Sequence, residues 1–415
     1  MSGPAKKHQL EWNLLVLVTA ALVLFGLVMV YSATSASAAL GNRSPTGYLE
    51  RQGMYAVVGL VLLAAASRWD FRRLRALAPA LVIAALVACL AVLVIGAQIN
   101  GARRWISFGP AAFQPSELAK LALVVWTAAY LARRPPPQSL KELARPIGLL
   151  VGLFSALVII EPDLGTVIVI LVMVGAILLV SGTRLTVLGS AYGIVLALAG
   201  IAAWSSPYRR ERLLTFMHPW QDPTNAGLQN VQALISLGSG GVFGRGLGQG
   251  IEKIHYLPEA HTDMIFAVIG EELGLVGVAV LMAGYCAFAY AGLRLAIGCR
   301  DPFGKRLAAG ITALVCGQAA INLAAVLGLA PLTGIPLPFV SYGGSSLVVM
   351  LASVGILLNI ARGDRGRAAA AVPDRGRRDG RPRGAGARGG GGAARARSGG
   401  DVRRVAGSRR GAARS

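Results

Sequence analysis

Charged residues are scarce in this sequence, and acids are scarcer than bases. Only 14% of the 415 residues are charged, against roughly 25% in an ordinary soluble protein, and 19 acids stand against 41 lysines and arginines. Apolar residues make up 54% of the chain, and its mean hydropathy is +0.59. Because so few charges cannot cover a soluble surface of this size, a soluble single-domain enzyme is excluded.

Cysteine is also rare, and nucleotide-binding motifs are missing. The four cysteines show no C-x-x-C spacing, so neither a disulfide framework nor a cysteine-ligated metal is predicted. The sequence has no Walker A motif and no H-E-x-x-H motif, and its one G-x-G-x-x-G match, at 384–389, follows no predicted strand. A nucleotide-driven pump and a metalloprotease are therefore not favoured.

Long apolar runs are what the sequence has in abundance. Roughly 20 helical residues cross the hydrocarbon core of a bilayer, and about ten runs approach that length. The pattern predicts an all-α polytopic membrane protein with about ten transmembrane helices. The predicted spans are 13–33, 54–66, 76–97, 117–132, 147–160, 164–181, 185–204, 264–293, 307–330 and 342–361.

Composition divides the chain into three parts. A short cytoplasmic N-terminus, 1–12, precedes the ten-helix transmembrane domain, 13–361. The remaining segment, 362–415, holds 16 of the 41 basic residues and 4 of the 19 acids, and is rich in glycine and alanine. Since such a segment cannot bury enough apolar surface to fold alone, it is predicted to be a disordered basic tail in the cytoplasm.

The distribution of charge predicts the two sides of the membrane. An even number of spans puts both termini on one side, and the segments on that side carry most of the lysines and arginines, which marks the cytoplasm. Most acids outside the tail fall on the outer segments. The longest of these is the loop 204–263 between the seventh and eighth spans, and a loop of that length is usually functional or disordered. The outer face is therefore where we expect a functional site.

The densest polar cluster closes that loop, immediately before the eighth span. In one interpretation Thr262 or Asp263 caps the following helix. In a second, His255, Glu259, His261 and Asp263 hold a metal ion, although their spacing lacks the H-x-x-x-H pair of a helical metal site. In a third, a carboxylate acts as a general base at the membrane surface, which a capping role does not exclude.

A second polar cluster lies between the third and fourth predicted spans. Arg103 and Arg104 precede a proline that suits the first turn of a helix, and Glu117 and Lys120 stand three residues apart on that helix, where they could pair. Basic residues on the outer face run against the positive-inside rule, which favours an anionic partner such as a diphosphate headgroup. Contact with ordinary phospholipid is the alternative.

Two shorter motifs complete the outer face. Residues 161–166 predict a turn followed by a helix start, and acids such as Asp163 at membrane depth also favour a functional role. Residues 331–346 contain helix-breaking prolines and then a Ser-Tyr-Gly-Gly-Ser-Ser run from Ser341, which lets the last span approach its neighbours closely.

Together these motifs resemble the shape, elongation, division and sporulation (SEDS) family of bacterial membrane proteins. The matching stretches are Gly-Ala-Arg-Arg-Trp-Ile from Gly101, Phe-Gln-Pro-Ser-Glu-Leu-Ala-Lys from Phe113, Glu-Pro-Asp-Leu-Gly-Thr from Glu161, Leu-Pro-Glu-Ala-His-Thr-Asp from Leu257 and Phe-Val-Ser-Tyr-Gly-Gly-Ser-Ser from Phe339. The resemblance runs from the first span to about Arg362 and looks closer to the cell-division members of the family than to its elongation members.

The resemblance implies a peptidoglycan glycosyltransferase that polymerises lipid II on the outer face of the cytoplasmic membrane. Asp263 would be the catalytic general base, undecaprenyl diphosphate would be the leaving group, and the anomeric linkage would be inverted. The expected ligands of the diphosphate are Arg103, Arg104 and Lys120. Five further residues would complete the substrate site: Glu117 beside Lys120, His261 and Thr262 at the approach to Asp263, and Asp163 and Ser341 in the cavity wall.

The same resemblance implies the partners and the location. Besides lipid II and membrane lipids, these are a class B penicillin-binding protein with transpeptidase activity, docked beside the eighth and ninth spans and the long outer loop, and other division proteins at the septum. No nucleic acid is expected as a partner. No particular cofactor is predicted, but a divalent cation, magnesium or manganese, would suit the diphosphate.

Two other classes of function fit parts of the pattern. A flippase for lipid II would also need many spans and intramembrane charges, but transport needs polar groups accessible from both leaflets, and the acids here gather on one face. A non-catalytic division scaffold would rely mainly on the basic tail. The concentration of acids on the outer face favours surface chemistry over transport.

Overall fold

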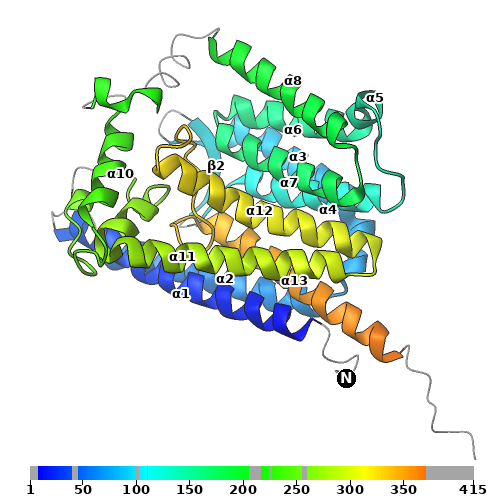
Figure 1. The fold of residues 1–415 in the computed structure, drawn as a ribbon, viewed down its shortest axis with the longest axis horizontal. Coiled ribbons are helices and arrows are strands. Elements are labelled where there is room, and N and C mark those ends of the chain that lie inside the picture. The colour runs from blue at the N-terminus through cyan, green and yellow to red at the C-terminus, as the bar shows by residue number, and fades with distance from the viewer. Residues whose placement is uncertain are drawn as a thin grey trace, which may run out of the picture. The chain divides into compact units, whose positions relative to one another are not determined.

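The computed structural model describes residues 8–39, 45–99, 102–109, 111–204, 216–223, 227–254 and 259–370. These residues are mainly helical and form an up-and-down bundle in which consecutive long helices run in alternating directions (Figure 1). The long helices are α1 (Gln9–Ala39), α2 (Pro45–Arg68), α3 (Leu74–Ile95), α4 (Pro115–Leu131), α6 (Leu149–Ile160), α7 (Leu164–Ser181), α8 (Leu185–Trp204), α11 (Ile265–Gly298), α12 (Pro302–Val326) and α13 (Gly344–Ala370).

The predicted membrane architecture is confirmed, and each predicted span overlaps one of these helices. Within the described ranges, eight helices are long and apolar enough to cross a membrane, and the described apolar part of α8 is a shorter one, Leu185–Ile201. α4, with 17 residues, is also short. α6 is preceded by the short helix α5 (Leu140–Leu143) and a π-helical turn, η3 (Ala144–Gly148), which together lengthen the fifth span. The count of ten spans stays a prediction.

The described residues also include a small sheet, which the all-α prediction missed. Strands β1 (Ala97–Ile99), β2 (Ala102–Phe108) and β3 (Ala111–Phe113) pair antiparallel in the order β1-β2-β3. Aromatic and β-branched residues in β2, such as Trp105 and Ile106, favour extended backbone, and Gly109 takes the positive φ of 60° that the turn before β3 needs. The strands are too short to stand out beside the membrane spans.

Helix extends into the start of the predicted tail. α13 continues through Arg362 to Ala370, so helix occupies the start of the segment that we expected to be disordered. The rest of that segment, 371–415, lies outside the described residues. The long loop contains the helix α10 (Leu228–Ser239), with short 3-10 turns η4 (Pro219–Gln221) and η5 (Glu252–Ile254) on either side.

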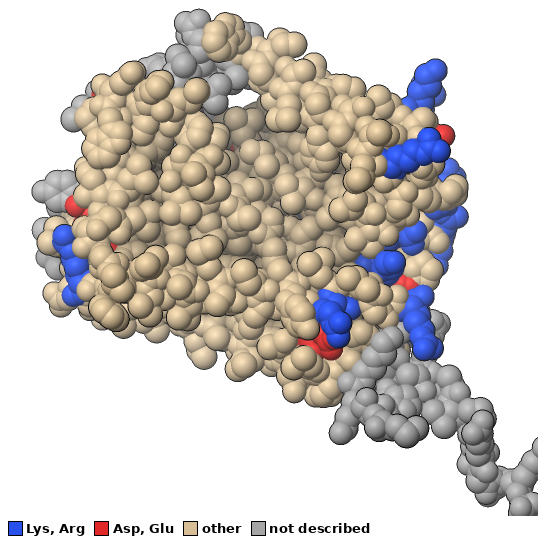
Figure 2. Space-filling view, viewed as in Figure 1, with Lys and Arg blue, Asp and Glu red and all other residues tan. Residues whose placement is uncertain are grey.

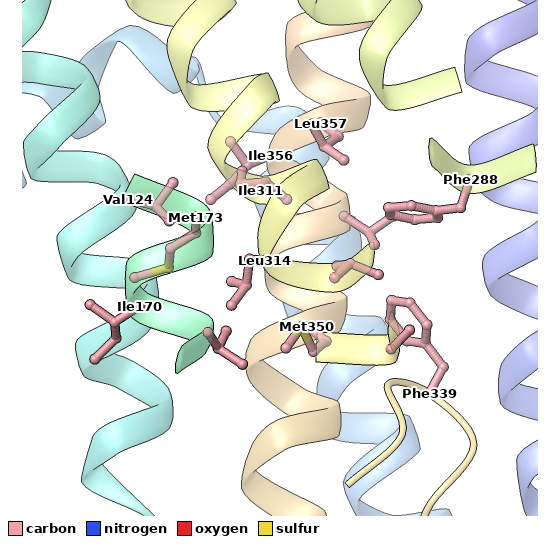
Figure 3. Close-up of a cluster of buried hydrophobic side chains, with 14 of the residues drawn as sticks. Val124, Ile170, Met173, Phe288, Ile311, Leu314, Phe339, Met350, Ile356 and Leu357 are labelled. Atoms are coloured by element: carbon pink, nitrogen blue, oxygen red, sulfur yellow. The ribbon is translucent and has the colours of Figure 1, made fainter. Parts of the chain in front are cut away.

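α12 lies at the centre of the bundle. Figure 3 shows its side chains Ile311 and Leu314 between Met173 of α7 and Met350 of α13, and all four are fully buried. α12 also contacts α4 and α11, so the helices that follow each polar motif pack around one apolar core. This core fixes how those motifs face one another at the end of the bundle.

The two ends of the bundle differ in charge. We call the end where α1 begins and α13 ends the inner end, and the end where α1 ends and α13 begins the outer end; they lie to the right and left of Figure 1. Figure 2 shows lysines and arginines gathered at the inner end and an uncharged flank between the ends. This distribution is the one that the positive-inside rule describes, and assigning the inner end to the cytoplasm stays a prediction.

Candidate functional site

The predicted site residues gather at the outer end, and α12 connects several of them. Two amide side chains one helical turn apart, Gln318 and Asn322, emerge from α12 there. Gln318 accepts a hydrogen bond from Lys120 Nζ (2.6 Å), and Asn322 Nδ2 donates to the backbone carbonyl of Asp263 (2.8 Å). α12 therefore links the cluster on α4 to the turn before α11.

The turn that carries Asp263 is fixed through its backbone. Besides the bond to Asp263, Asn322 donates to the carbonyl of Ile335 (2.9 Å), and the amide of Tyr342 donates to the carbonyl of His261 (2.9 Å). Thr262 Oγ1 donates to Asp263 Oδ1 (3.2 Å). The Asp263 residue is neither buried nor fully exposed, so a rigid turn presents a partly accessible carboxylate.

The predicted helix cap at this turn is wrong. The N-cap position of α11 belongs to Met264, and no side chain makes a capping hydrogen bond there. Helix capping by Thr262 or Asp263 therefore does not account for the polar residues that precede α11.

His261 lies beside Asp263 among aromatic rings. Its ring meets Tyr48 edge-on, with centroids 4.8 Å apart, and Tyr342 at 5.6 Å. Burial lowers the pKa of His261, against an opposing effect of the nearby Glu259 carboxylate. A neutral imidazole at physiological pH therefore adds no positive charge beside Asp263. The role of His261 at the approach to that carboxylate stays a prediction.

The predicted pairing of Glu117 with Lys120 is observed. Lys120 Nζ donates to Glu117 Oε1 at 2.8 Å, one turn along α4. Lys120 is 0% exposed and Glu117 only 2%, so the pair is enclosed between α4 and α12. A diphosphate could reach the Lys120 ammonium only if Glu117 or Gln318 moved, and a direct role of Lys120 in substrate binding stays a prediction.

The two neighbouring arginines lie in different settings on β2. Arg104 donates to the carbonyl of Glu161 (2.7 Å) and to that of Pro162, which places its charge at the C-terminal end of α6. It thereby fastens the β-hairpin to the turn between α6 and α7. Arg103 is exposed, and its hydrogen bond to the carbonyl of Leu93 is long (3.4 Å). Arg103 is thus the more accessible of the two guanidinium groups.

Asp163 has a structural position that the sequence motif only partly indicated. It is the N-cap of α7, where Oδ1 accepts from the amide of Thr166 (3.0 Å) and Oδ2 accepts from its hydroxyl (2.8 Å). The side-chain amide of Gln114, before α4, also donates to Asp163 Oδ2 (3.2 Å), and the backbone amide of Gln114 donates to Ser345 Oγ (3.0 Å). The starts of α4, α7 and α13 are therefore tied together through polar side chains.

Ser341 is buried at the outer end, in a tight turn before α13. Its hydroxyl accepts from the amide of Leu337 (2.8 Å), and Gln52 of α2 donates to its carbonyl (3.1 Å). Gly344 follows closely, because a Cβ there would lie 2.3 Å from the ring of Tyr55. The Ser-Tyr-Gly-Gly run thus allows the predicted close approach of the last span to α2.

The glycine-rich segment 240–250 supplies backbone hydrogen-bond partners to α11 where that helix is interrupted. α11 is interrupted at Gly274, which leaves the helical region (φ 64°, ψ −162°). An unbroken helix would bond the amides of residues 275 and 276 to the carbonyls of 271 and 272. Here the loop supplies both sets of partners: Arg245 N to Glu271 O (3.0 Å), Gly246 N to Glu272 O (2.9 Å), Leu275 N to Gly241 O (3.0 Å) and Val276 N to Val242 O (3.1 Å).

The side chains of Glu271 and Glu272 hold the same loop, and both are 0% exposed. Glu271 Oε1 accepts from the amide of Ile251 (2.8 Å). Glu272 pairs with Lys253 Nζ (2.5 Å) and accepts from Ser32 Oγ of α1 (2.7 Å). These acids therefore build the outer end and do not face an open surface.

Sequence reasoning missed Gln318 and Asn322, although a signal was present. Both are amides inside an otherwise apolar span, where a polar side chain is costly without a partner. Their partners belong to α4 and to loops far along the chain, so the sequence indicated that they matter but not what they bind.

The metal interpretation has no support from the described residues. His255 lies outside them, and within them no three His, Cys, Asp or Glu residues gather where a metal ion could be held. The acids that are present are mostly bonded to protein donors. No chemical step is therefore derived through a metal, and the divalent cation stays a prediction.

Comparison with known proteins identifies the family of the chain. Residues 12–366 match the model of the FtsW, RodA and SpoVE family, described as cell cycle proteins. A probable peptidoglycan glycosyltransferase FtsW of Geobacter sp. (strain M18) is 41% identical over 86% of this chain and 98% of its own length. Stage V sporulation protein E of Bacillus subtilis is 37% identical over 85% of this chain and 97% of its own length.

Solved structures show the same fold. A chain from a structure on the coordination of polymerization and crosslinking by a peptidoglycan synthase complex is 33% identical, with a TM-score of 0.70 over 84% of this chain and 97% of its own. The rod shape determining protein RodA of Thermus thermophilus is 31% identical, with a TM-score of 0.62 over 84% of this chain and 95% of its own.

Proposed function

This chain belongs to the FtsW, RodA and SpoVE family of cell cycle proteins, and from that premise we propose that it is a peptidoglycan glycosyltransferase that polymerises lipid II during septal cell-wall synthesis. Relatives about 40% identical over most of the chain are named probable peptidoglycan glycosyltransferase FtsW. The similarity to FtsW supports the division role.

In the proposed reaction, the 4-hydroxyl of an acceptor N-acetylglucosamine attacks C1 of a donor N-acetylmuramic acid. The new bond joins that oxygen to C1, the bond from C1 to the diphosphate oxygen breaks, and undecaprenyl diphosphate leaves with its electron pair. Attack from the opposite face inverts the α linkage to β. The hydroxyl proton passes to the Asp263 carboxylate, which acts as general base.

The setting of Asp263 is the observation that carries this assignment. Glu117, Asp163, Glu271 and Glu272 are buried and accept hydrogen bonds from protein groups, so they cannot meet a substrate without rearrangement. Asp263 combines a partly accessible side chain with a turn fixed at its own backbone carbonyl. A general base needs both access to the substrate and a fixed position.

The diphosphate is assigned to the basic residues of the hairpin and α4. Arg103 is exposed and would make the first contact, with Arg104 behind it. Lys120 is positioned by Glu117 and Gln318. Its positive charge would stabilise the diphosphate electrostatically from its buried position, or by direct contact after a side-chain movement. Stabilising the departing diphosphate should matter at least as much as the base, because charge develops there in the transition state.

The remaining site residues have supporting roles in this proposal. His261 and Thr262 shape the approach to Asp263, while Asp163 and Ser341 hold the surrounding helix starts and turns in place. A class B penicillin-binding protein is proposed as the crosslinking partner, since a similar chain belongs to a peptidoglycan synthase complex that coordinates polymerization and crosslinking.

The test is polymerisation of labelled lipid II by the purified chain, with and without the transpeptidase, resolved on a gel. Asp263→Asn, which keeps the size of the side chain, should slow strand formation by about 10² to 10⁴-fold. Glu259→Gln is the matched control, because Glu259 lies on the same turn and is exposed. Its rate should stay within about threefold of wild type.

Two outcomes would overturn the proposal. If Asp263→Asn polymerises lipid II at the wild-type rate, the assignment of Asp263 as general base is wrong. Absence of polymer under every condition, together with movement of lipid II between the leaflets of vesicles containing the protein, would replace the glycosyltransferase by a flippase.

A further inference from the structure

A cavity lies at the inner end, at the opposite end of α4 from Lys120. It has a volume of about 210 Å³ and is formed where α3 begins and α4 ends. Its lining residues are Arg75, Ala78, Pro79, Trp126, Ala129, Tyr130, Arg133 and Arg134. None of the polar site residues described above takes part in it.

The lining is positively charged and contains no acid. In the part of the chain that the structure describes, no acidic group lies within ion-pair distance of Arg75, Arg133 or Arg134. Arg75 Nε is also buried there without a hydrogen-bond acceptor. A buried donor without an acceptor is unfavourable, and an anion in the cavity would supply one.

One arginine is held in place by aromatic rings. The guanidinium of Arg134 lies over the ring of Tyr130 (5.1 Å), and its NH1 group donates to the Tyr130 hydroxyl (3.2 Å). Tyr130 in turn stacks on Trp126, with centroids 5.3 Å apart and planes 11° apart. A guanidinium already oriented in this way loses less freedom when it binds an anion.

The surroundings favour a ligand that joins an anion to an apolar chain. Ala78, Pro79 and Ala129 give the cavity an apolar wall. Further along α3, Ile83 and Val87 have exposed side chains, 61% and 59%, which suits contact with lipid tails. Tryptophan and tyrosine beside basic residues are typical of the headgroup level of a membrane.

We propose that this cavity binds a phosphate group at the cytoplasmic surface, carried by an anionic phospholipid of the inner leaflet. The three arginines bind the phosphate oxygens, the Trp126 and Tyr130 rings hold Arg134 toward them, and the apolar wall contacts the start of the acyl chains. A free phosphate ion shares the same recognition chemistry, and the test separates the two sources. The proposal does not depend on the glycosyltransferase function.

The experiment measures binding of phosphatidylglycerol to the purified full chain in detergent by native mass spectrometry, with phosphatidylcholine for comparison. The test variant carries Arg75→Gln, Arg133→Gln and Arg134→Gln together. The matched control carries Arg68→Gln, Arg73→Gln and Arg184→Gln, which remove the same charge from exposed arginines of the inner end outside the cavity. Phosphatidylglycerol binding should weaken by about tenfold in the test variant and by less than about twofold in the control.

Separate arms identify the source of the phosphate and guard against misfolding. Inorganic phosphate at millimolar concentration should not displace the lipid; if it does so in wild type, and loses that effect in the test variant, the free ion is the ligand of the same site. Arg134→Gln alone, at an exposed side chain, should still weaken lipid binding by about threefold. Equal losses in both triple variants, or no loss in either, would overturn the proposal.

Discussion

Basic residues at the two ends of the bundle do different work. At the outer end Lys120 and Lys253 are buried, and each is paired with an acid: Lys120 with Glu117 on the same helix, α4, and Lys253 with Glu272 on α11. At the inner end Arg133 and Arg134 are exposed and have no acidic partner within the described ranges. These two lysines therefore hold buried parts of the outer end together, whereas these two arginines of the inner end face the surroundings. A rule that counts charges on each side of a membrane does not separate these two uses.

The largest effect on stability should come from breaking an outer pair. Lys120→Met leaves Glu117 buried without its partner, and removing one member of a buried pair costs about 3–5 kcal/mol. Arg133→Gln at the inner end should change stability by no more than about 0.5 kcal/mol. The midpoint of thermal unfolding in detergent measures both.

A double variant separates the pair from its surroundings. Lys120→Met combined with Glu117→Gln removes both charges, so much of the lost stability should return. If Lys120→Met alone unfolds at the wild-type temperature, the enclosed pair is not what stabilises the outer end.

A smaller effect is expected where the glycine loop meets α11. Gly244 and Gly248 both have positive φ, 79° and 82°, so alanine strains the backbone equally at either position. At Gly244 a Cβ would also lie 2.2 Å from the carbonyl oxygen of Glu272, whereas nothing lies within 4 Å at Gly248. Gly244→Ala should therefore destabilise by about 2–3 kcal/mol and Gly248→Ala by about 1 kcal/mol, as measured by thermal unfolding. Equal losses would mean that the loop does not pack into the break of α11.

An effect of a different kind, which depends on pH, concerns a buried acid at the outer end that has no hydrogen-bond partner in the described structure. Glu161 is 1% exposed, and neither of its carboxyl oxygens has a hydrogen-bond partner in the described structure. Burial, assisted by Asp163 and opposed by Arg104, raises the pKa of Glu161 from 4.5 to about 8. The folded protein therefore keeps this proton when the unfolded chain has already lost it, and stability falls as pH rises from 4.5 to about 8.

Glu161→Gln removes that titration and keeps the shape of the side chain. The variant and the wild type should unfold at similar temperatures near pH 4.5, and the variant should be more stable by a few degrees at about pH 9. Parallel unfolding curves across that range would show that Glu161 is ionised in the folded protein.

The sequence predicted the helices of the bundle and the end that carries the site, but not how charges pair there. Apolar runs of membrane length are local patterns, so each predicted span overlaps a helix. The pairing of Glu117 with Lys120 was predictable, because three residues apart means one helix face. The enclosure of that pair by Gln318, almost two hundred positions away, depends on packing between α4 and α12, which no local pattern encodes.

The backbone hydrogen bonds between segment 240–250 and α11 could not be predicted from the sequence either. The six glycines of segment 240–250 permit close approach to another backbone, but they do not show that the partner is α11 itself. The apolar run of the eighth span gave no sign of a break at Gly274, because a single glycine inside a span is common in membrane helices. The capping prediction at Asp263 failed for a related reason, since tertiary bonds from Asn322 and Tyr342 fix that turn.

At the break of α11 at Gly274, the hydrogen bonds of the helix are made with a loop segment, so that segment is structurally part of the helix. Residues 241–246 precede α11 in sequence, yet their amides and carbonyls serve as part of its hydrogen-bonding ladder. An epitope or fluorescent tag inserted there would act as a helix break in the middle of a span, whereas loops normally tolerate such insertions. Labelling strategies for the outer face should treat this stretch as core.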